Sequence, residues 1–179
     1  PLSTPSHASF SGLPNFSTVL ADGLVSVYSG LGVGNTVHAI GHGAGYATLS
    51  SQDCRDAIRT FHIELIAGMA TKLSKVPEGD GTMLDNTVIV YTSDNAANHH
   101  SYGFDWPMFV LGNLGGKLKS KGRYLAYPRY GNQGHHHTIC NWFTTLCHLA
   151  GVPQDLFGQP DMALGKAEDQ AGPLSELLA

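Results

Sequence analysis

The stretch Asn86–Asn113, NTVIVYTSDNAANHHSYGFDWPMFVLGN, decides the expected fold. It opens with the apolar, β-branched run Thr87–Tyr91, whose length is typical of a strand buried on both faces. Polar residues follow at once, and a second short apolar run, Met108–Leu111, begins behind Pro107. Ligands in open α/β sheets bind at the carboxyl ends of the strands, so Asp94 stands where such a fold places its chemistry.

Outside this stretch, the sequence predicts one further strand and two helices. The strand is expected at Leu24–Tyr28, followed by a Gly-rich loop over residues 30–45. A capping-box pattern at Ser50 and Asp53 predicts the start of the first helix. Apolar residues then recur at steps of three and four, which predicts a helix side that packs on the sheet: Ile58, Phe61, Leu65, Met69, Leu73 and Val76. The second helix is predicted over residues 138–150.

This order of strands and helices favours an α/β fold with a layered sheet. Residues 1–179 are expected to form a single α/β domain, because no internal repeat divides the chain. Within it, residues 1–18 form an extended lead-in and residues 151–179 a C-terminal tail.

Composition excludes several classes of partner. A net charge of -4 and the lack of a basic run argue against nucleic acid and anionic membranes. No apolar stretch reaches the roughly 18 residues that span a bilayer. Cys140 and Cys147 lie about 10 Å apart along the predicted helix, too far to bridge. Buried free thiols are therefore expected, with a bridge from Cys54 to one of them as the alternative.

The loops carry residues that suit metal ions. Carboxylate and amide oxygens suit hard cations such as calcium, imidazole suits zinc, and three protein ligands with one open position is the catalytic zinc arrangement. The candidate ligands are His38, His42, Asp94, Asn95, His99, His100, His135, His136 and His137. The alternatives are an Asx turn at Asp94–Asn95 and solvated loop histidines. His62 and His148 are expected to lie within helices without partners.

The same residues resemble a known superfamily. The run GTMLDNTVIVYTSDN at Gly81–Asn95, then HH and WPMFVLG, is similar to the C-terminal half of the alkaline phosphatase/sulfatase superfamily. The sulfatase branch has a similar D-N-T-h-h-h-h-T-S-D-N-G block, where h is apolar, although Ala96 replaces its final glycine here. The longer matches resemble an exported bacterial sulfatase-like family of unknown function within that superfamily: Phe61–His62, VPEGDGTMLDNT, GGKLK, AGVPQDLFG and GPLSELL.

The resemblance implies that the chain is the C-terminal part of an α/β/α sandwich with a mainly parallel sheet and a two-metal site. Asp94 and Asn95 resemble the late acidic pair of one metal site. His38 and His42 resemble the D-x-x-x-H motif of the other, with histidine in place of the acid, and one of His135–His137 resembles its last histidine. The early metal-binding Asp and the nucleophile belong to an N-terminal part that this chain lacks.

Three interpretations follow. The chain is part of a metal-dependent phosphate- or sulfate-ester hydrolase that binds zinc or calcium and is incomplete as a catalyst alone. Alternatively it is a non-catalytic structural or accessory subunit, with or without a degenerate metal site. The third interpretation is that the chain is a plain α/β fragment whose histidines have no role. The expected partner is its own missing N-terminal part or another protein subunit, and the resemblance implies a periplasmic or extracellular location.

Overall fold

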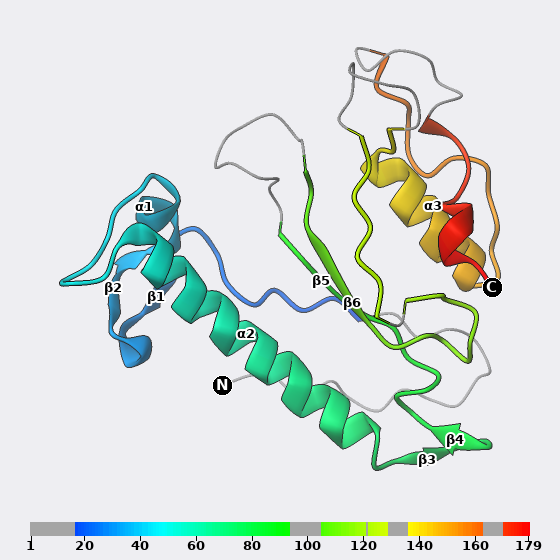
Figure 1. Cartoon of the computed structure of the whole chain (residues 1–179), viewed down its shortest axis with the longest axis horizontal. Helices are drawn as coiled ribbons and strands as arrows, with labels where there is room; N and C mark the ends of the chain where they lie inside the picture. Colours follow the sequence, from blue (N-terminus) through cyan, green and yellow to red (C-terminus); the bar gives the residue numbers. More distant parts are fainter. Residues whose placement is uncertain (1–16, 94–104, 121, 129–135, 163–169) are drawn as a thin grey trace.

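The computed structural model describes residues 17–93, 105–120, 122–128, 136–162 and 170–179 (Figure 1). The long helix α2 has the N-terminal elements at its beginning and a small hairpin at its end. In chain order the described elements are β1 (Val27–Tyr28), the 3-10 helix η1 (Ser29–Leu31), β2 (Val33–Thr36), α1 (Val37–Gly41), α2 (Ser51–Leu73), β3 (Pro77–Glu78), β4 (Gly81–Thr82), β5 (Ile89–Thr92), β6 (Met108–Leu111), α3 (Ile139–Leu149) and the 3-10 helix η4 (Ser175–Leu177).

The strands contradict the predicted fold class. They form three separate antiparallel pairs, β1–β2, β3–β4 and β5–β6. The prediction of an α/β/α sandwich with a mainly parallel sheet is therefore wrong. A parallel pair needs a crossover that brings the strand before a helix beside the strand after it. Here β1 and β2 precede α2 but pair with each other at its N-terminal end, away from β5 (Figure 1).

The β5–β6 ribbon replaces the predicted central strand. Its register is continuous, from Ile89 opposite Leu111 to Thr92 opposite Met108. The strand prediction at Met108–Leu111 is confirmed. The prediction that Thr87–Tyr91 forms a central strand is wrong, because β5 starts at Ile89 and its one strand neighbour in the described part of the chain is β6.

One face of the ribbon packs on α3 and the C-terminal segment. We define the C-terminal cluster by its buried members: Leu118, Trp142, Leu149, Leu174 and Leu177. Val90 and Val110 of the ribbon pack against it. Buried polar groups hold the segment in place, since the Asn141 amide donates to the carbonyls of Ala171 and Gly172 at 2.9 and 3.0 Å. The second predicted helix is thus confirmed, and it organises this half of the molecule.

A second, smaller core forms around the beginning of α2. We define the N-terminal cluster by Val33, Ile40, Cys54 and Ile58, all buried. Ile40 belongs to α1, which lies within the Gly-rich segment predicted as a loop, so that prediction is wrong there and at β2. The Thr36 hydroxyl accepts a hydrogen bond from the backbone N–H of Ala39 and caps α1. This cap gives the segment a helical turn despite its glycines.

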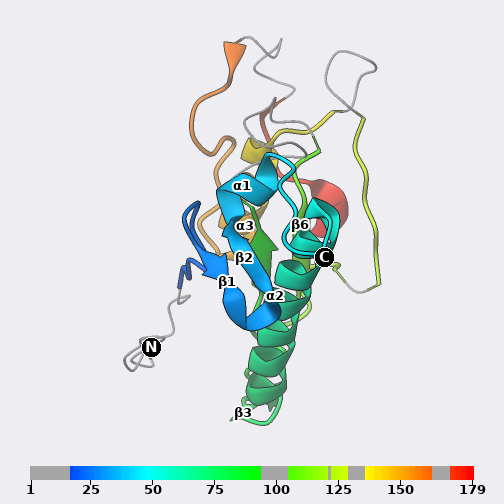
Figure 2. The same ribbon diagram turned by 90° about the vertical axis from the view of Figure 1, so that its left-hand side faces the viewer.

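The apolar side of α2 is covered unevenly, and in its second half Ala70 is buried while other apolar residues are exposed. The predicted capping box is confirmed, with Ser50 and Asp53 bonded reciprocally. Ile58 is buried, but Leu65 is 48% and Met69 44% exposed, so the prediction that both pack on a sheet is wrong. The hairpin β1–β2 and α1 lie over the N-terminal half of the helix and do not reach further (Figure 2).

Candidate functional site

Two of the predicted ligands lie together at α1, His38 within the helix and His42 at its C-cap. The rings of His38 and His42 are 4.7 Å apart between centroids, at an interplanar angle of 75°. The spacing of four brings them to the same side of the helical turn, since the backbone N–H of His42 bonds the carbonyl of His38. Two imidazoles at this separation form a partial coordination set for a borderline metal such as zinc.

His136 and His137 lie at the start of α3, where their surroundings differ. The His137 ring stands edge-on to Tyr127, with centroids 4.7 Å apart. The Tyr127 hydroxyl donates to Glu176 at 2.5 Å. Burial acts to raise the pKa of Glu176, but the hydrogen bonds from Tyr127 and its own backbone, with the nearby His137 and Arg123, leave it below its ordinary value. His137 therefore adjoins a tyrosine–carboxylate pair.

The described residues do not assemble the predicted metal site. α1 and the beginning of α3 lie on opposite sides of the β5–β6 ribbon (Figure 1). Among residues the structure describes, no group of three or more His, Cys, Asp or Glu side chains could hold a metal ion. The other predicted ligands lie outside the described residues: Asp94, Asn95, His99, His100 and His135. The zinc or calcium site thus stays a prediction.

His62, which was predicted to have no partner, has two hydrogen-bond partners in the structure. His62 is buried in α2, with 5% of its surface exposed. Its Nε2 lies 2.7 Å from the Tyr28 hydroxyl, and its Nδ1 lies 3.0 Å from the Tyr91 hydroxyl. The prediction for His148 is also wrong, since its Nε2 lies 3.1 Å from the Gln154 carbonyl oxygen.

One set of proton positions satisfies this whole network. The Tyr28 hydroxyl donates to Asp22 at 3.3 Å, so its oxygen accepts from the Nε2–H of His62. The Tyr91 hydroxyl then donates to Nδ1. Burial and the negative charge of Asp22 raise the pKa of Tyr28 to about 12. Burial and the same charge also raise the pKa of Tyr91. Both tyrosines are therefore protonated donors at neutral pH.

The network joins segments that belong to different cores. Tyr28 lies in β1 and packs against the N-terminal cluster, whereas Tyr91 lies in β5, whose neighbour Val90 packs against the C-terminal cluster. His62 lies between them on α2. A sequence signal for it exists: Cys54, Ile58 and His62 follow one another at steps of four, which places His62 on the buried side. In this structure the His62 side chain connects the two cores through its hydrogen bonds to Tyr28 and Tyr91.

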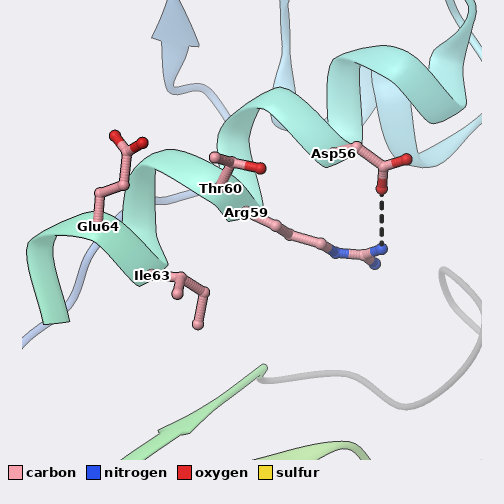
Figure 3. A pocket seen from close by; sticks show the side chains of 5 residues that line it. All are labelled: Asp56, Arg59, Thr60, Ile63 and Glu64. Atoms are coloured by element: carbon pink, nitrogen blue, oxygen red, sulfur yellow. Dashed lines mark ion pairs between the residues drawn. The ribbon is translucent and has the colours of Figure 1, made fainter. Parts of the chain in front are cut away.

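Two open surface depressions lie among the described residues. The depression drawn in Figure 3 has a volume of about 330 Å³ and is lined by one stretch of α2: Asp56, Arg59, Thr60, Ile63 and Glu64. Arg59 extends along the helix to an exposed ion pair with Asp56 at 3.9 Å. A second hollow, of about 460 Å³, lies between residues 115–117, 148–149 and 178–179.

Two further findings bear on function. None of the described helices is long and apolar enough to cross a membrane. Comparison with protein-family models, with curated proteins and with solved structures finds no match to this chain.

Proposed function

We propose that this chain is a non-catalytic structural or accessory component of a larger assembly, and that another protein surface covers its apolar side. The observation that carries the proposal is the second half of α2. Leu65 and Met69 continue the apolar side that Ile58 begins, yet each is nearly half exposed. Ala70, in the same half of the helix, is buried, so Leu65 and Met69 are apolar side chains that the chain leaves exposed beside a covered one. Neighbouring exposed apolar side chains on a helix form a surface whose burial against another protein is favourable.

Other exposed apolar residues support association. Leu20 and Val25 are both 84% exposed, and they belong to a segment of exposed apolar side chains that ends at the first residue of β1: Val19, Leu20, Leu24, Val25 and Val27. Single exposed apolar residues are ordinary, but a sequence-continuous group marks an interaction surface. At about 25 cal/mol per Å², covering such side chains contributes on the order of 1 kcal/mol each.

The proposed partner is a protein surface, either a further part of the same protein or a separate subunit. The net charge of -4 gives no basis for nucleic acid. An apolar helix side fits the hydrophobic centre of a permanent protein interface.

Light scattering on size-exclusion fractions, over a wide concentration range, tests this proposal. Association above the 19.0 kDa chain mass is expected. The double variant Leu65→Glu/Met69→Glu should weaken it at least about tenfold, because two charges would enter the interface. Thr60→Glu/Ala67→Glu, which adds the same charges on another side of α2, is the matched control. A monomer at every concentration would contradict the proposal.

The second candidate function is that of a metal-dependent phosphate- or sulfate-ester hydrolase. The close approach of His38 and His42 favours it, because neutral imidazoles are catalytic zinc ligands. In that case a metal would bind ester oxygens and stabilise the charge that develops on them. A third ligand would have to come from Asp94, another predicted residue or a partner.

A further inference from the structure

The positive charges of this chain are concentrated in one part of its sequence. Residues 106–154 contain five of the ten lysines and arginines and no aspartate or glutamate, so their formal charge is +5. The rest of the chain holds the other five cations and all 14 acidic residues, so its formal charge is -9. The net charge of -4 is therefore the sum of two parts of opposite sign, and such an asymmetry acts on the choice of partners.

Two of these cations are fixed on one side of a short bridge to the C-terminal segment. Leu118 pairs with Leu178 in antiparallel orientation, and it is only 3% exposed. The backbone N–H of Lys119 donates to the Leu177 carbonyl at 2.8 Å and holds this pairing in register. Because side chains alternate along extended backbone, Lys117 and Lys119 lie together on the opposite, exposed side, about 7 Å apart.

Arg123 brings a third cation to the same place. Its guanidinium donates to the carbonyl of Lys119 at 3.2 Å and to that of Glu176 at 2.7 Å, so backbone atoms of two segments set its position. The Glu176 carboxylate is nearby and accepts from the Tyr127 hydroxyl. Even with this carboxylate counted, the three cations leave the surface positive. A side chain that is already held in place loses less conformational entropy when it binds a partner.

An exposed aromatic residue adjoins the three cations. Tyr124 follows Arg123 directly and is 92% exposed. Arginine and tyrosine are enriched in protein interfaces and among the residues that contribute most to binding. We define the basic surface by four described residues: Lys117, Lys119, Arg123 and Tyr124. It offers one aromatic contact and three charges from two neighbouring stretches of the chain.

We infer that the basic surface binds an acidic segment of the partner protein, whose carboxylates pair with Lys117, Lys119 and Arg123. The inference rests on the proposed assembly and adds the chemistry of the partner at a second contact surface. A single exposed ion pair is weak, so recognition depends on several pairs formed at once. An extended segment with acidic residues at alternate positions presents its carboxylates about 7 Å apart, which matches the spacing of the two lysines.

The charge distribution favours a protein partner over a polyanion. Nucleic acids and anionic membranes carry negative charge far beyond the area of the basic surface. They would also meet the formal charge of -9 on the rest of the chain. An acidic protein segment needs only local complementarity, which supplies specificity at a defined contact.

Fluorescence anisotropy with a labelled peptide tests the inference on the intact chain. The probe is a peptide of about eight residues with glutamate at alternate positions, spaced by about 7 Å when extended. The same peptide with glutamine in place of glutamate is the control probe. At about 50 mM salt we expect the glutamate peptide to bind at least about tenfold more tightly. At about 300 mM salt the difference should shrink, because salt screens exposed ion pairs.

Two double variants locate the binding. Lys117→Gln/Lys119→Gln should weaken binding of the glutamate peptide at least about fivefold, because it removes two of the pairing charges. Lys72→Gln/Lys75→Gln removes the same charge from exposed lysines at the end of α2 and is the matched control, with binding expected within about twofold of the wild type. Circular dichroism checks that both variants fold.

The outcomes separate this inference from the proposed assembly. Weakened binding in Lys117→Gln/Lys119→Gln but not in the control supports the basic surface. Equal binding of the two peptides, or equal weakening in both variants, overturns it, and association in light scattering would then leave the assembly intact. Peptide binding by a chain that stays monomeric supports the surface and contradicts the assembly. Tighter binding of a single-stranded oligonucleotide or of phosphatidylserine vesicles than of the glutamate peptide would assign the surface to polyanions and overturn the inference.

Discussion

The substitution His62→Ala tests whether the two cores depend on the histidine link. It removes both hydrogen bonds, at 2.7 Å to Tyr28 and 3.0 Å to Tyr91, and leaves two partly buried hydroxyls without this partner. Each lost bond costs about 1 kcal/mol. The space left by a side chain that is only 5% exposed adds about 1 kcal/mol more. We therefore expect the free energy of unfolding to fall by about 3 kcal/mol.

Urea titration, followed by circular dichroism and by tryptophan fluorescence, measures this fall in the free energy of unfolding. The far-ultraviolet circular dichroism signal is dominated by α2, whereas tryptophan fluorescence reports Trp106 and Trp142, next to the ribbon and in the C-terminal cluster. The two transitions should coincide in the wild type and separate in His62→Ala, because the link no longer couples the cores. The control is His148→Ala, which removes one bond from a less buried histidine and should cost under about 1 kcal/mol. A loss below about 1 kcal/mol in His62→Ala, with coincident transitions, would refute the reasoning.

Three further predictions follow from the same geometry. The pKa of Tyr28 rises from its ordinary 10.0 to about 12, so its contribution to stability is complete below pH 10 and disappears as pH rises from 10 toward 12. Tyrosinate absorbance should show a late-titrating group that Tyr28→Phe removes, and an unchanged titration curve in that variant would count against the Asp22 contact. The lowered pKa of Glu176 means that its contribution is present above pH 4.5 and is lost on acidification, so Glu176→Gln should flatten the acid limb of the melting temperature. An equal acid slope in both proteins would disprove this. If the metallohydrolase candidate is correct, purified protein should bind zinc stoichiometrically by elemental mass spectrometry, and His38→Ala and His42→Ala should each lose it; full retention in either variant would remove that ligand from the site.

The sequence predicted the parts of the fold that depend on local chemistry. The capping box at Ser50 and the second helix are confirmed, because hydrogen bonds within a few residues specify them. All three cysteines are free, but the prediction that they are buried holds only for Cys54, since Cys140 and Cys147 are partly buried. Strand pairing depends on what lies elsewhere in the chain, and the buried pattern at Thr87–Tyr91 does not encode which neighbours cover it. The antiparallel ribbon was missed for this reason.

The apolar side of helix α2 shows the same limit of prediction from sequence. The spacing from Ile58 to Met69 correctly identified an apolar side, but the sequence does not state how far the covering elements extend. The α1 turn was missed because a Thr36 cap outweighs the glycines that follow. Of the candidate site, the approach of His38 and His42 follows from their spacing. His62 was missed because its partners are distant in sequence, at separations of 34 and 29 residues.

The division into two cores has a consequence for the order of folding. The N-terminal cluster joins Val33 to Ile58 through one hairpin, one turn and the start of one helix, so it closes short loops. The C-terminal cluster depends on contacts that close long loops, such as the bond from Arg123 to the backbone of Glu176, 53 residues away. Loop closure costs more entropy as the loop lengthens. The N-terminal cluster should therefore form first during synthesis, and α2 should carry His62 into place before Tyr91 leaves the ribosome. The last event is then the docking of β5 onto a histidine that is already held by Tyr28.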